Sequence, residues 1–276
     1  MRRVNNKKDD LYPTVLTIGG SDSGGGAGIQ ADLRAFYYFK VFGTSVITAV
    51  TAQNPNIVAD IHPVPIKNLK SQLISVLSAF SVSHIKIGML FSVEIIEVIT
   101  EILSEYSNSV KLIVDPLMIS TSGRPLLEKN AVQILKNLLI PMADIITPNL
   151  PEAHILAEIN PEEDISSEKL AEILTKKYDT AVLLTGGHSK EQIEKVIDIL
   201  CFEDSLYSIS NPRIKNCRTT HGTGCSVSAA LTACLANGMS PYEAAEKAVQ
   251  YVRMSLKNTI KIGENAHALW PCKPKK

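Results

Sequence analysis

The segment from Gly222 to Ser226 places glycines, hydroxyl groups and a cysteine just before a run of small apolar residues. The spacing of that run predicts a buried helix that begins near residue 224. The first turn of a helix offers unpaired N–H groups and a partial positive charge, which together bind anions. Cys225 would lie in this field, which favours a thiolate and hence a general base. Gly222, Thr223, Gly224 and Cys225 are therefore candidate catalytic residues, and the alternative is a helix cap with an inert cysteine.

Two acidic residues stand just after predicted strands. Asp115 follows the apolar run 111–114, and Glu152 follows the run 144–147. Carboxylates in such places can hold a hard divalent cation such as Mg²⁺, although each can equally be a helix cap. Asn149 has two similar interpretations, as an N-cap or as a contact with phosphate. An anion cradle beside a divalent metal favours phosphoryl transfer, which depends on positioning and charge neutralisation.

Strands and helices alternate along the chain, and these elements must position the candidate residues. Apolar runs predict strands at 14–18, 43–50, 84–88, 111–114, 144–147 and 180–185 and a hairpin at 194–210, and helical spacing predicts helices at 29–39, 66–79, 92–106, 128–139, 149–156, 166–178, 224–233 and 241–258. Uninterrupted apolar strands are typical of sheets covered on both faces. We therefore expect an α/β fold, a single-domain three-layer α/β/α sandwich with a mostly parallel sheet. This domain is expected at 13–270, after a flexible tail at 1–12, with ligands bound at the carboxyl ends of the strands.

Composition narrows the class of protein. The chain has 276 residues, and its 28 Lys and Arg balance its 28 Asp and Glu, which argues against nucleic acid or a membrane surface as a partner. Its five cysteines form no C-x-x-C pair, which favours a reducing, cytoplasmic location over a disulfide framework. We find no signal peptide and no apolar run of the ~18 residues that a membrane span needs. The motifs G-x-G-x-x-G and G-K-S/T are both absent, so dinucleotide-binding and P-loop chemistry lose support.

Six blocks in order resemble the hydroxymethylpyrimidine/phosphomethylpyrimidine kinase branch of the ribokinase-like kinases. The blocks are 17–32, 43–54, 86–90, 114–118, 146–153 and 221–230. The resemblance implies ATP-dependent phosphorylation of a small-molecule substrate, 4-amino-5-hydroxymethyl-2-methylpyrimidine, and then of its monophosphate, on the route to thiamine diphosphate. It also implies a ribokinase-like fold, ATP and Mg²⁺ as cofactors, and a homodimer.

The resemblance also assigns a place to individual residues. By position, the pocket for the pyrimidine would be lined by Gly20, Ala27, Asp32, Gln53, Gly88, Met89 and Leu117. Gln53 is the most informative, because an amide both donates and accepts and so matches a ring nitrogen beside an exocyclic amine. Without the resemblance, Gln53 would be interpreted as a solvated loop residue and Met89 as a core filler.

The rest of the site follows from the same resemblance. Cys225 would occupy the place of the aspartate base of related sugar kinases, with Gly222 to Gly224 over the transferring phosphate. Asn149, Thr185 and Gly187 would contact ATP, and Asp115 and Glu152 would organise Mg²⁺.

The chain departs from the family pattern at one informative position. Thr121 stands where the family usually has a lysine in a mobile flap, which leaves open whether both phosphorylations occur. One alternative is a pyridoxal/pyridoxine kinase of the same branch, whose members tend to have an apolar residue at the position of Gln53. Others are a non-catalytic ligand-binding protein on this scaffold, and a cysteine hydrolase or redox protein that would need a partner for Cys225, such as His221.

Overall fold

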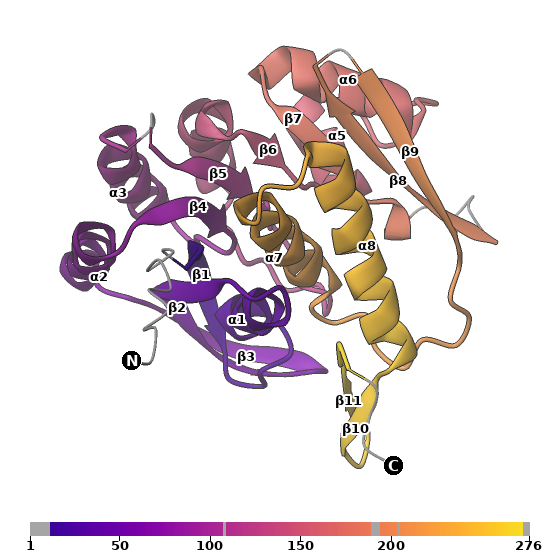
Figure 1. The fold of residues 1–276 in the computed structure, drawn as a ribbon, viewed down its shortest axis with the longest axis horizontal. Helices are drawn as coiled ribbons and strands as arrows, with labels where there is room; N and C mark the ends of the chain where they lie inside the picture. The colour runs from indigo at the N-terminus through magenta and orange to yellow at the C-terminus, as the bar shows by residue number, and fades with distance from the viewer. Residues whose placement is uncertain (1–11, 107–108, 189–193, 204, 273–276) are drawn as a thin grey trace, which may run out of the picture.

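The computed structural model describes residues 12–106, 109–188, 194–203 and 205–272, so residues 1–11 of the expected tail lie outside the described part. Its central strands are β1 (Thr14–Asp22), β2 (Phe42–Asn54), β3 (Ile57–Pro63), β4 (Val82–Ile87), β5 (Lys111–Val114), β6 (Ile145–Ile146), β7 (Ala181–Leu184), β8 (Lys195–Phe202) and β9 (Ser205–Pro212). Within the described residues they form one sheet in the order β3-β2-β1-β4-β5-β6-β7-β8-β9 (Figure 1).

Helices cover this sheet. They are α1 (Gly28–Tyr38), α2 (Ile66–Ala79), α3 (Val93–Ser104), α4 (Ala131–Ile134), α5 (Leu150–Ala157), α6 (Ser167–Tyr178), α7 (Thr223–Ala236) and α8 (Pro241–Lys257). The single helix expected at 128–139 is wrong in detail, because α4 is followed by a π-helical turn, Leu135–Leu139, and a 3₁₀ turn, Ile140–Met142. Pro141 lacks the N–H that α-helical bonding would need there. None of the described helices is long and apolar enough to cross a membrane.

Alternate residues of the strands face two different helical layers. In β5, Leu112 and Val114 pack in the cluster that includes α2, α3, α5 and α6. Ile113, between them, packs in the cluster formed with α1, α7 and α8. Figure 1 shows these two groups of helices on opposite faces of the sheet. Burial on both faces explains why the strands are uninterrupted apolar runs, and the expected three-layer α/β/α architecture is confirmed.

The strand order reverses at β1, and this reversal determines where ligands can bind. β1 pairs in parallel with β2 on one side and with β4 on the other. The pairs β4–β5, β5–β6 and β6–β7 are also parallel, whereas β3, β8 and β9 join antiparallel. In open α/β sheets the crevice at such a reversal is the ligand site. The glycine-rich segment 23–28 follows β1 at this point.

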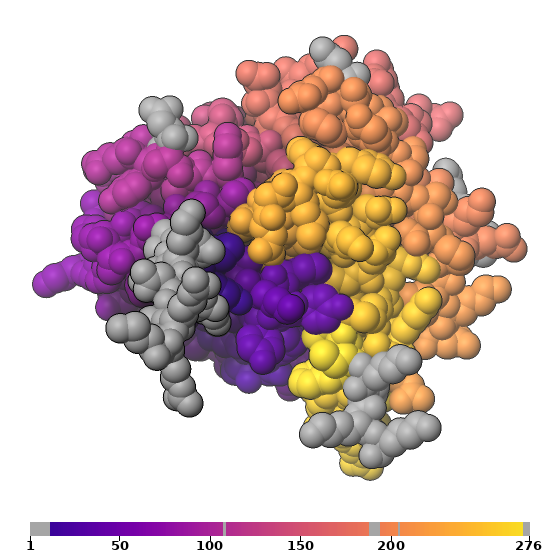
Figure 2. All heavy atoms as spheres, viewed as in Figure 1, coloured from indigo at the N-terminus to yellow at the C-terminus, as the bar shows by residue number. Residues whose placement is uncertain are grey.

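The C-terminal helices close one face of the molecule. Residues 225–234 of α7 are all buried, and their small side chains let this helix lie close to α1 and the sheet. Figure 2 shows the yellow α8 and the hairpin of β10 (Ile260–Gly263) and β11 (Ala266–Ala268) on the surface beside the indigo N-terminal part. The packing of α7 under α8 brings the start of α7 to the carboxyl ends of the parallel strands.

Candidate active site

A cavity of about 550 Å³ opens at the carboxyl ends of the parallel strands. Its walls come from the loop after β1, the end of β2, the loops after β4, β5, β6 and β7, and the start of α7. These segments are far apart in the sequence, and the sheet brings them together. A large concave site of this kind is the place where an α/β protein binds its ligands.

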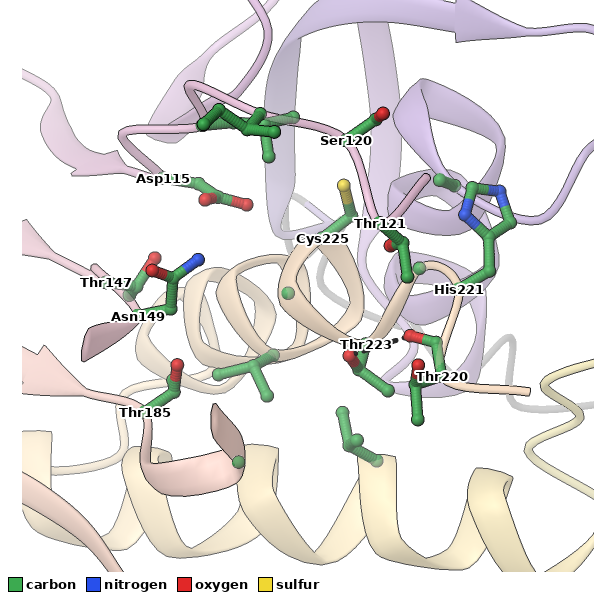
Figure 3. Close-up of a pocket in the computed structure, with 18 of the residues that line it drawn as sticks. Asp115, Ser120, Thr121, Thr147, Asn149, Thr185, Thr220, His221, Thr223 and Cys225 are labelled. Carbon is green, nitrogen blue, oxygen red and sulfur yellow. Dashed lines mark hydrogen bonds between the residues drawn. The ribbon is translucent and has the colours of Figure 1, made fainter. Parts of the chain in front are cut away.

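The start of α7 forms the floor of this cavity. Gly222 is the N-cap residue with a φ of +83°, and no side chain caps the helix. The Thr223 hydroxyl instead donates to the Thr220 carbonyl at 2.9 Å, as the dashed line in Figure 3 marks. The Thr223 amide also donates to the Thr220 carbonyl, at 3.2 Å, and no side chain caps the other amides of the first turn. Gly222, Thr223, Gly224 and Cys225 all line the cavity, so an anion here would meet the positive end of α7.

Cys225 faces the cavity but is not a thiolate in this state. Figure 3 shows its sulfur directed away from the axis of α7, on the side of the cavity. Burial raises the pKa of the thiol to about 12; the Lys86 ammonium opposes this rise, and the Asp115 and Asp32 carboxylates add to it. The expected thiolate is thus wrong for the ligand-free protein, because desolvation outweighs the field of the helix start.

His221 does not pair with Cys225. Its Nε2 lies 3.0 Å from Asp22 Oδ2, which leaves the cysteine without the histidine partner that a hydrolase would need. Figure 3 shows the imidazole at the opposite end of the labelled site from Asp115. The Cys–His interpretation of this segment is therefore wrong.

Asp22 organises the glycine-rich loop, a role that the sequence analysis missed. Its Oδ1 accepts from Gly24 N at 2.8 Å, and its Oδ2 accepts from Gly26 N at 3.0 Å and Ala27 N at 2.8 Å. Burial raises the pKa of Asp22, but the bonds from His221 and the loop amides outweigh it, and the pKa lies below its usual value. The signal in the sequence was an aspartate two positions before a run of glycines, which is typical of a side chain that bonds to the backbone of a turn.

Five of the seven residues expected around the pyrimidine line the cavity, and two do not. The five are Gly20, Ala27, Gln53, Met89 and Leu117. Asp32 is instead fully buried below it, where it accepts from Thr17 Oγ1 at 2.6 Å and from Lys86 Nζ at 3.0 Å. Asp32 faces the sheet because α1 turns this position inward. It therefore cannot touch a ligand.

Gly88 also lies outside the main cavity. It borders a small neighbouring hollow, and a side chain there would meet Lys86 Nζ, 2.6 Å from an added Cβ. The glycine therefore makes room for the buried Lys86 ammonium and contributes no surface for a pyrimidine.

Gln53 is held in place at the end of β2. Its backbone N–H and carbonyl each bond to Ser23 Oγ at 2.8 Å. Its side-chain Oε1 lies 3.0 Å from Thr51 Oγ1, and its Nε2 lies 3.3 Å from His221 Nε2. The interpretation as a solvated loop residue is therefore wrong, because the amide is oriented at the wall of the cavity.

Asp115 and Glu152 meet at the centre of the cavity wall. They are 4% and 5% exposed. Ser228 Oγ donates to Asp115 at 3.1 Å, and Asn149 N donates to Glu152 at 3.0 Å. Burial raises the pKa of both carboxyls; that of Glu152 rises to about 8, and the Asp115 charge contributes to the rise.

The buried carboxylate pair fits a divalent cation. The Asp115 charge raises the pKa of Glu152, and no cation is among the groups that oppose this rise. No cluster of three or more His, Cys, Asp or Glu side chains arranged for a metal occurs in the described part of the chain. Mg²⁺ usually takes only one or two carboxylates and completes its shell with water and phosphate oxygens. The pair therefore suits magnesium held together with a nucleotide.

Asn149 is an N-cap, and its interpretation as a phosphate contact stays a prediction. Its Oδ1 accepts from Glu152 N at 2.9 Å and forms a capping box with Glu152 at the start of α5. Figure 3 shows the nitrogen of the same amide directed toward the interior of the site. Thr185 and Gly187 line the cavity nearby, as expected. One amide can therefore cap the helix and still donate to a phosphate.

An apolar wall completes this end of the cavity, and sequence reasoning missed it. The residues that form it are Val196, Val227, Val249, Val252 and Leu256. Three of them belong to α8, where an apolar stripe in the sequence is usually interpreted as the face that packs on the hydrophobic core. Asp198 lies in the same wall and accepts from Gly186 N at 2.9 Å. Burial raises the pKa of Asp198 to about 6.

Thr121 lies on a short turn over the cavity. Ser120 N donates to the Arg124 carbonyl at 2.8 Å, and Ile119 pairs with Pro125, so the segment folds back on itself. Arg124 Nη1 donates to the carbonyls of Val58 and Ala59 at 2.6 and 2.7 Å, which ties the turn to β3. Thr121 lines the cavity from this turn, where the resemblance expected a flap.

Known proteins match this chain over nearly its whole length. A family model described as phosphomethylpyrimidine kinase matches residues 22–270. The hydroxymethylpyrimidine/phosphomethylpyrimidine kinase of Haemophilus influenzae is 45% identical over 252 residues, which cover 91% of this chain and 93% of the relative. The crystal structure of a phosphomethylpyrimidine kinase from Clostridium difficile 630 superimposes with a TM-score of 0.77 at 37% identity and covers 90% of this chain and 100% of that one. The pyridoxal kinase from Staphylococcus aureus in complex with AMP-PCP and pyridoxal gives a TM-score of 0.84 at 32% identity, with 95% and 94% covered.

Proposed function

The chain belongs to the phosphomethylpyrimidine kinase family, and we propose that it uses ATP to phosphorylate 4-amino-5-hydroxymethyl-2-methylpyrimidine and then its monophosphate. The second product is the diphosphate that thiamine biosynthesis uses. The observation that carries this proposal is the convergence of Gln53, Cys225 and the Asp115–Glu152 pair on one cavity. In that arrangement Gln53 can hydrogen-bond the pyrimidine ring, Cys225 can lie beside the acceptor hydroxyl, and the two carboxylates can hold a metal–phosphate complex.

The pyrimidine would lie over the loop after β1. Gly20 leaves room there, because an added Cβ would be 2.7 Å from Met89 Sδ. The Gln53 amide is positioned to pair with a ring nitrogen and the exocyclic amine, and Met89 supplies an apolar contact for the ring face. The hydroxymethyl group would then point toward Cys225 and the start of α7.

The triphosphate would run from the start of α7 toward Asn149. The amides of Gly222 and Gly224 would face the transferring phosphoryl group, and the Asn149 amide and Thr185 hydroxyl can donate to the phosphates behind it. The apolar wall formed by β8, α7 and α8 suits an adenine ring. ATP use is supported by the S. aureus pyridoxal kinase, a structure of which holds AMP-PCP together with pyridoxal.

Asp115 and Glu152 would hold Mg²⁺ between the protein and the phosphates. Bound there, Mg²⁺ would neutralise charge on the phosphate oxygens during transfer. The remaining work belongs to residues of the chain. Asn149 N–H orients the Glu152 carboxylate, and the Ser228 hydroxyl orients Asp115.

Cys225 is proposed to receive the proton of the acceptor hydroxyl. A thiol with a pKa near 12 is neutral in the free protein, so it can act as a base only in the small fraction that is ionised. In phosphoryl transfer the bond to the leaving group breaks early and the nucleophile loses its proton late, which makes a modest base sufficient. Thr121 reaches the cavity from the turn above and supplies a hydroxyl where a lysine would supply a charge.

The deciding experiment is a substrate panel. The purified protein, with ATP and Mg²⁺, is offered the aminopyrimidine alcohol, its monophosphate, pyridoxal and pyridoxine, and ADP release and phosphorylated product are measured for each. We expect the aminopyrimidine alcohol to be the preferred acceptor and its monophosphate to be used as well. No ADP release with any acceptor would instead support the non-catalytic ligand-binding protein.

A pyridoxal kinase is the second candidate, because the S. aureus pyridoxal kinase superimposes with the higher TM-score. A TM-score reports the shape of the fold, which both activities share, whereas the higher sequence identities are to the pyrimidine kinases. Gln53 discriminates the two chemically. We expect Gln53→Met to raise the KM for the aminopyrimidine at least about tenfold and to leave the KM for ATP nearly unchanged. Equal effects on both substrates would remove Gln53 from the acceptor pocket.

Homodimer formation and a cytoplasmic location are proposed with this function. Five free cysteines in the described structure suit a reducing compartment. The oligomeric state is measured by sedimentation equilibrium of the full chain. A mass near twice the 30.1 kDa of one chain is the expected result, and a mass of one chain at micromolar concentration would exclude the dimer.

A further inference from the structure

Two glycine-rich segments touch each other at the edge of the cavity. A Cβ added to Gly222 would lie 2.0 Å from the Gly26 carbonyl oxygen, and one added to Gly26 would lie 2.6 Å from His221 Cδ2. The substrate loop after β1 and the turn before α7 therefore pack against each other, although Asp22 in the first and His221 in the second are 199 positions apart in the sequence. Their relative position fixes the distance between the acceptor and the anion cradle.

One buried polar contact joins the two segments. The Asp22 carboxylate is 3% exposed and already accepts three amides of its own loop. Its Oδ2 also lies 3.0 Å from His221 Nε2, on the other segment. A carboxylate accepts hydrogen bonds, so the hydrogen of this bond is on Nε2 of the imidazole.

That hydrogen has a consequence for Gln53. The same Nε2 is 3.3 Å from Gln53 Nε2. A ring nitrogen that donates to Asp22 cannot also accept from the glutamine amide. Thr51 Oγ1 fixes the other end of this amide at 3.0 Å. The N–H groups of Gln53 are therefore left for whatever occupies the cavity.

We propose that His221 is a positioning residue for the acceptor: bonded to Asp22, it sets the spacing between the substrate loop and the start of α7 and keeps the Gln53 amide available to the ring. This inference rests on the proposed function. It predicts a larger effect on the acceptor than on ATP binding. Of the residues proposed to face the nucleotide, those around the adenine and the phosphates behind the transferred group come from the loops after β6 and β7 and from β8, α7 and α8, away from the contact between His221 and Asp22.

Steady-state kinetics of His221→Ala and His221→Gln tests the inference. Removing the imidazole should lower kcat/KM for the aminopyrimidine by about tenfold or more, since it breaks a hydrogen bond to a charged group, with the KM for ATP unchanged. The glutamine amide can still donate to Asp22, so His221→Gln should recover part of the loss. His62→Ala, an exposed histidine in β3, controls for the loss of an imidazole and should behave as the wild type.

A double-mutant cycle separates positioning from structural support. If His221 acts through the Gln53 amide, His221→Ala should lower kcat/KM for the aminopyrimidine only slightly further in a protein that already carries Gln53→Ala. The losses of the two single variants should therefore not add in the double variant. Additive losses, or equal losses for ATP and acceptor, would overturn the inference. If His221→Ala does not fold, the same cycle run with His221→Gln gives the answer. If the wild-type protein does not phosphorylate the aminopyrimidine, that result would instead overturn the proposed function itself.

Discussion

Cys225 lies among buried side chains of both charges, and this environment decides how it can act. Lys86, 1% exposed and bonded to Asp32, is the cation that lowers the thiol pKa, whereas burial, Asp115 and Asp32 raise it to about 12. If Cys225 accepts the hydroxyl proton, the rate must follow its ionised fraction. Reactivity at this residue therefore depends on pH in a way that a preformed thiolate would not.

We expect Cys225→Ala to fold and to lose turnover by at least ~10²-fold, as for the removal of a general base. In the wild type, kcat should rise about tenfold per pH unit between about pH 7 and 9, because the thiolate fraction rises by that factor below the pKa. The residual activity of Cys225→Ala should lack this slope. A variant with full activity would show that Cys225 is not the base.

The raised pKa of Glu152 predicts how the stability of the protein depends on pH and on magnesium. This pKa is about 8 in the fold against an ordinary value of 4.5, so the folded state holds a proton that the unfolded state releases. The stabilisation is present below about pH 4.5 and is lost as pH rises toward 8. Because Mg²⁺ displaces that proton, we expect Mg²⁺ with AMP-PCP to raise Tm more at pH 8 than at pH 6.

Thermal unfolding at both pH values, with and without Mg²⁺, checks this prediction. Glu152→Gln is the matched control, since it keeps the size and one acceptor of the side chain but carries no charge. The variant should lose the magnesium-dependent part of the Tm shift. A Tm shift of equal size in wild type and variant would show that Glu152 does not hold the metal.

The start of α7 is the element on which the site depends, and its glycines have separate roles. Gly222 has a positive φ and no room for a Cβ, whereas an added Cβ at Gly224 meets nothing within 4 Å. The first glycine is thus required by the fold, and the second is compatible with any small side chain as far as packing is concerned. The space above Gly224 is part of the cavity.

Alanine at the two positions should therefore have opposite profiles. Gly222→Ala should destabilise the protein by about 1–3 kcal/mol, from a strained φ and a clash with the substrate loop. Gly224→Ala should leave the free energy of unfolding nearly unchanged and should still impair phosphoryl transfer, because its methyl group enters the anion cradle. Chemical denaturation and steady-state rates measure the two properties. A stable, fully active Gly222→Ala variant would contradict the contact between the loops.

At the scale of the whole molecule, one sheet joins both hydrophobic clusters. The strands β1, β5, β6, β7 and β8 contribute residues to both clusters, so neither helical layer can detach without exposing the other face of the same strands. The site spans segments from β1 to α8 and is assembled only when this sheet is complete. We propose that residues 13–270 form a single cooperative domain.

Calorimetry of the full chain tests this proposal. A single transition is expected, with equal calorimetric and van't Hoff enthalpies. Saturating AMP-PCP should shift the entire transition upward, because a ligand that binds only the folded state stabilises all of it. Two resolved transitions, only one of them sensitive to AMP-PCP, would contradict a single domain.

The sequence by itself determined the order of the elements and the types of residue at the strand ends. Strands that are apolar on both faces can be recognised from a few neighbouring residues, so the layered α/β fold could be predicted before any contact was known. The same holds for the positions of Asp115, Asn149 and the start of α7 relative to the strands. The glycine of a helix start and the proline that interrupts a helix are likewise local. These features depend on neighbours within a few positions.

Tertiary structure alone decided which residues face the cavity and how they are charged. The inward rotation of α1 buried Asp32, desolvation kept Cys225 a thiol, and the pairing of Asp22 with His221 joined loops at opposite ends of the chain. The α8 stripe likewise became a cavity wall instead of core. Burial and long-range contact set pKa values and exposure, and neither is encoded in the spacing of residues along a strand or helix.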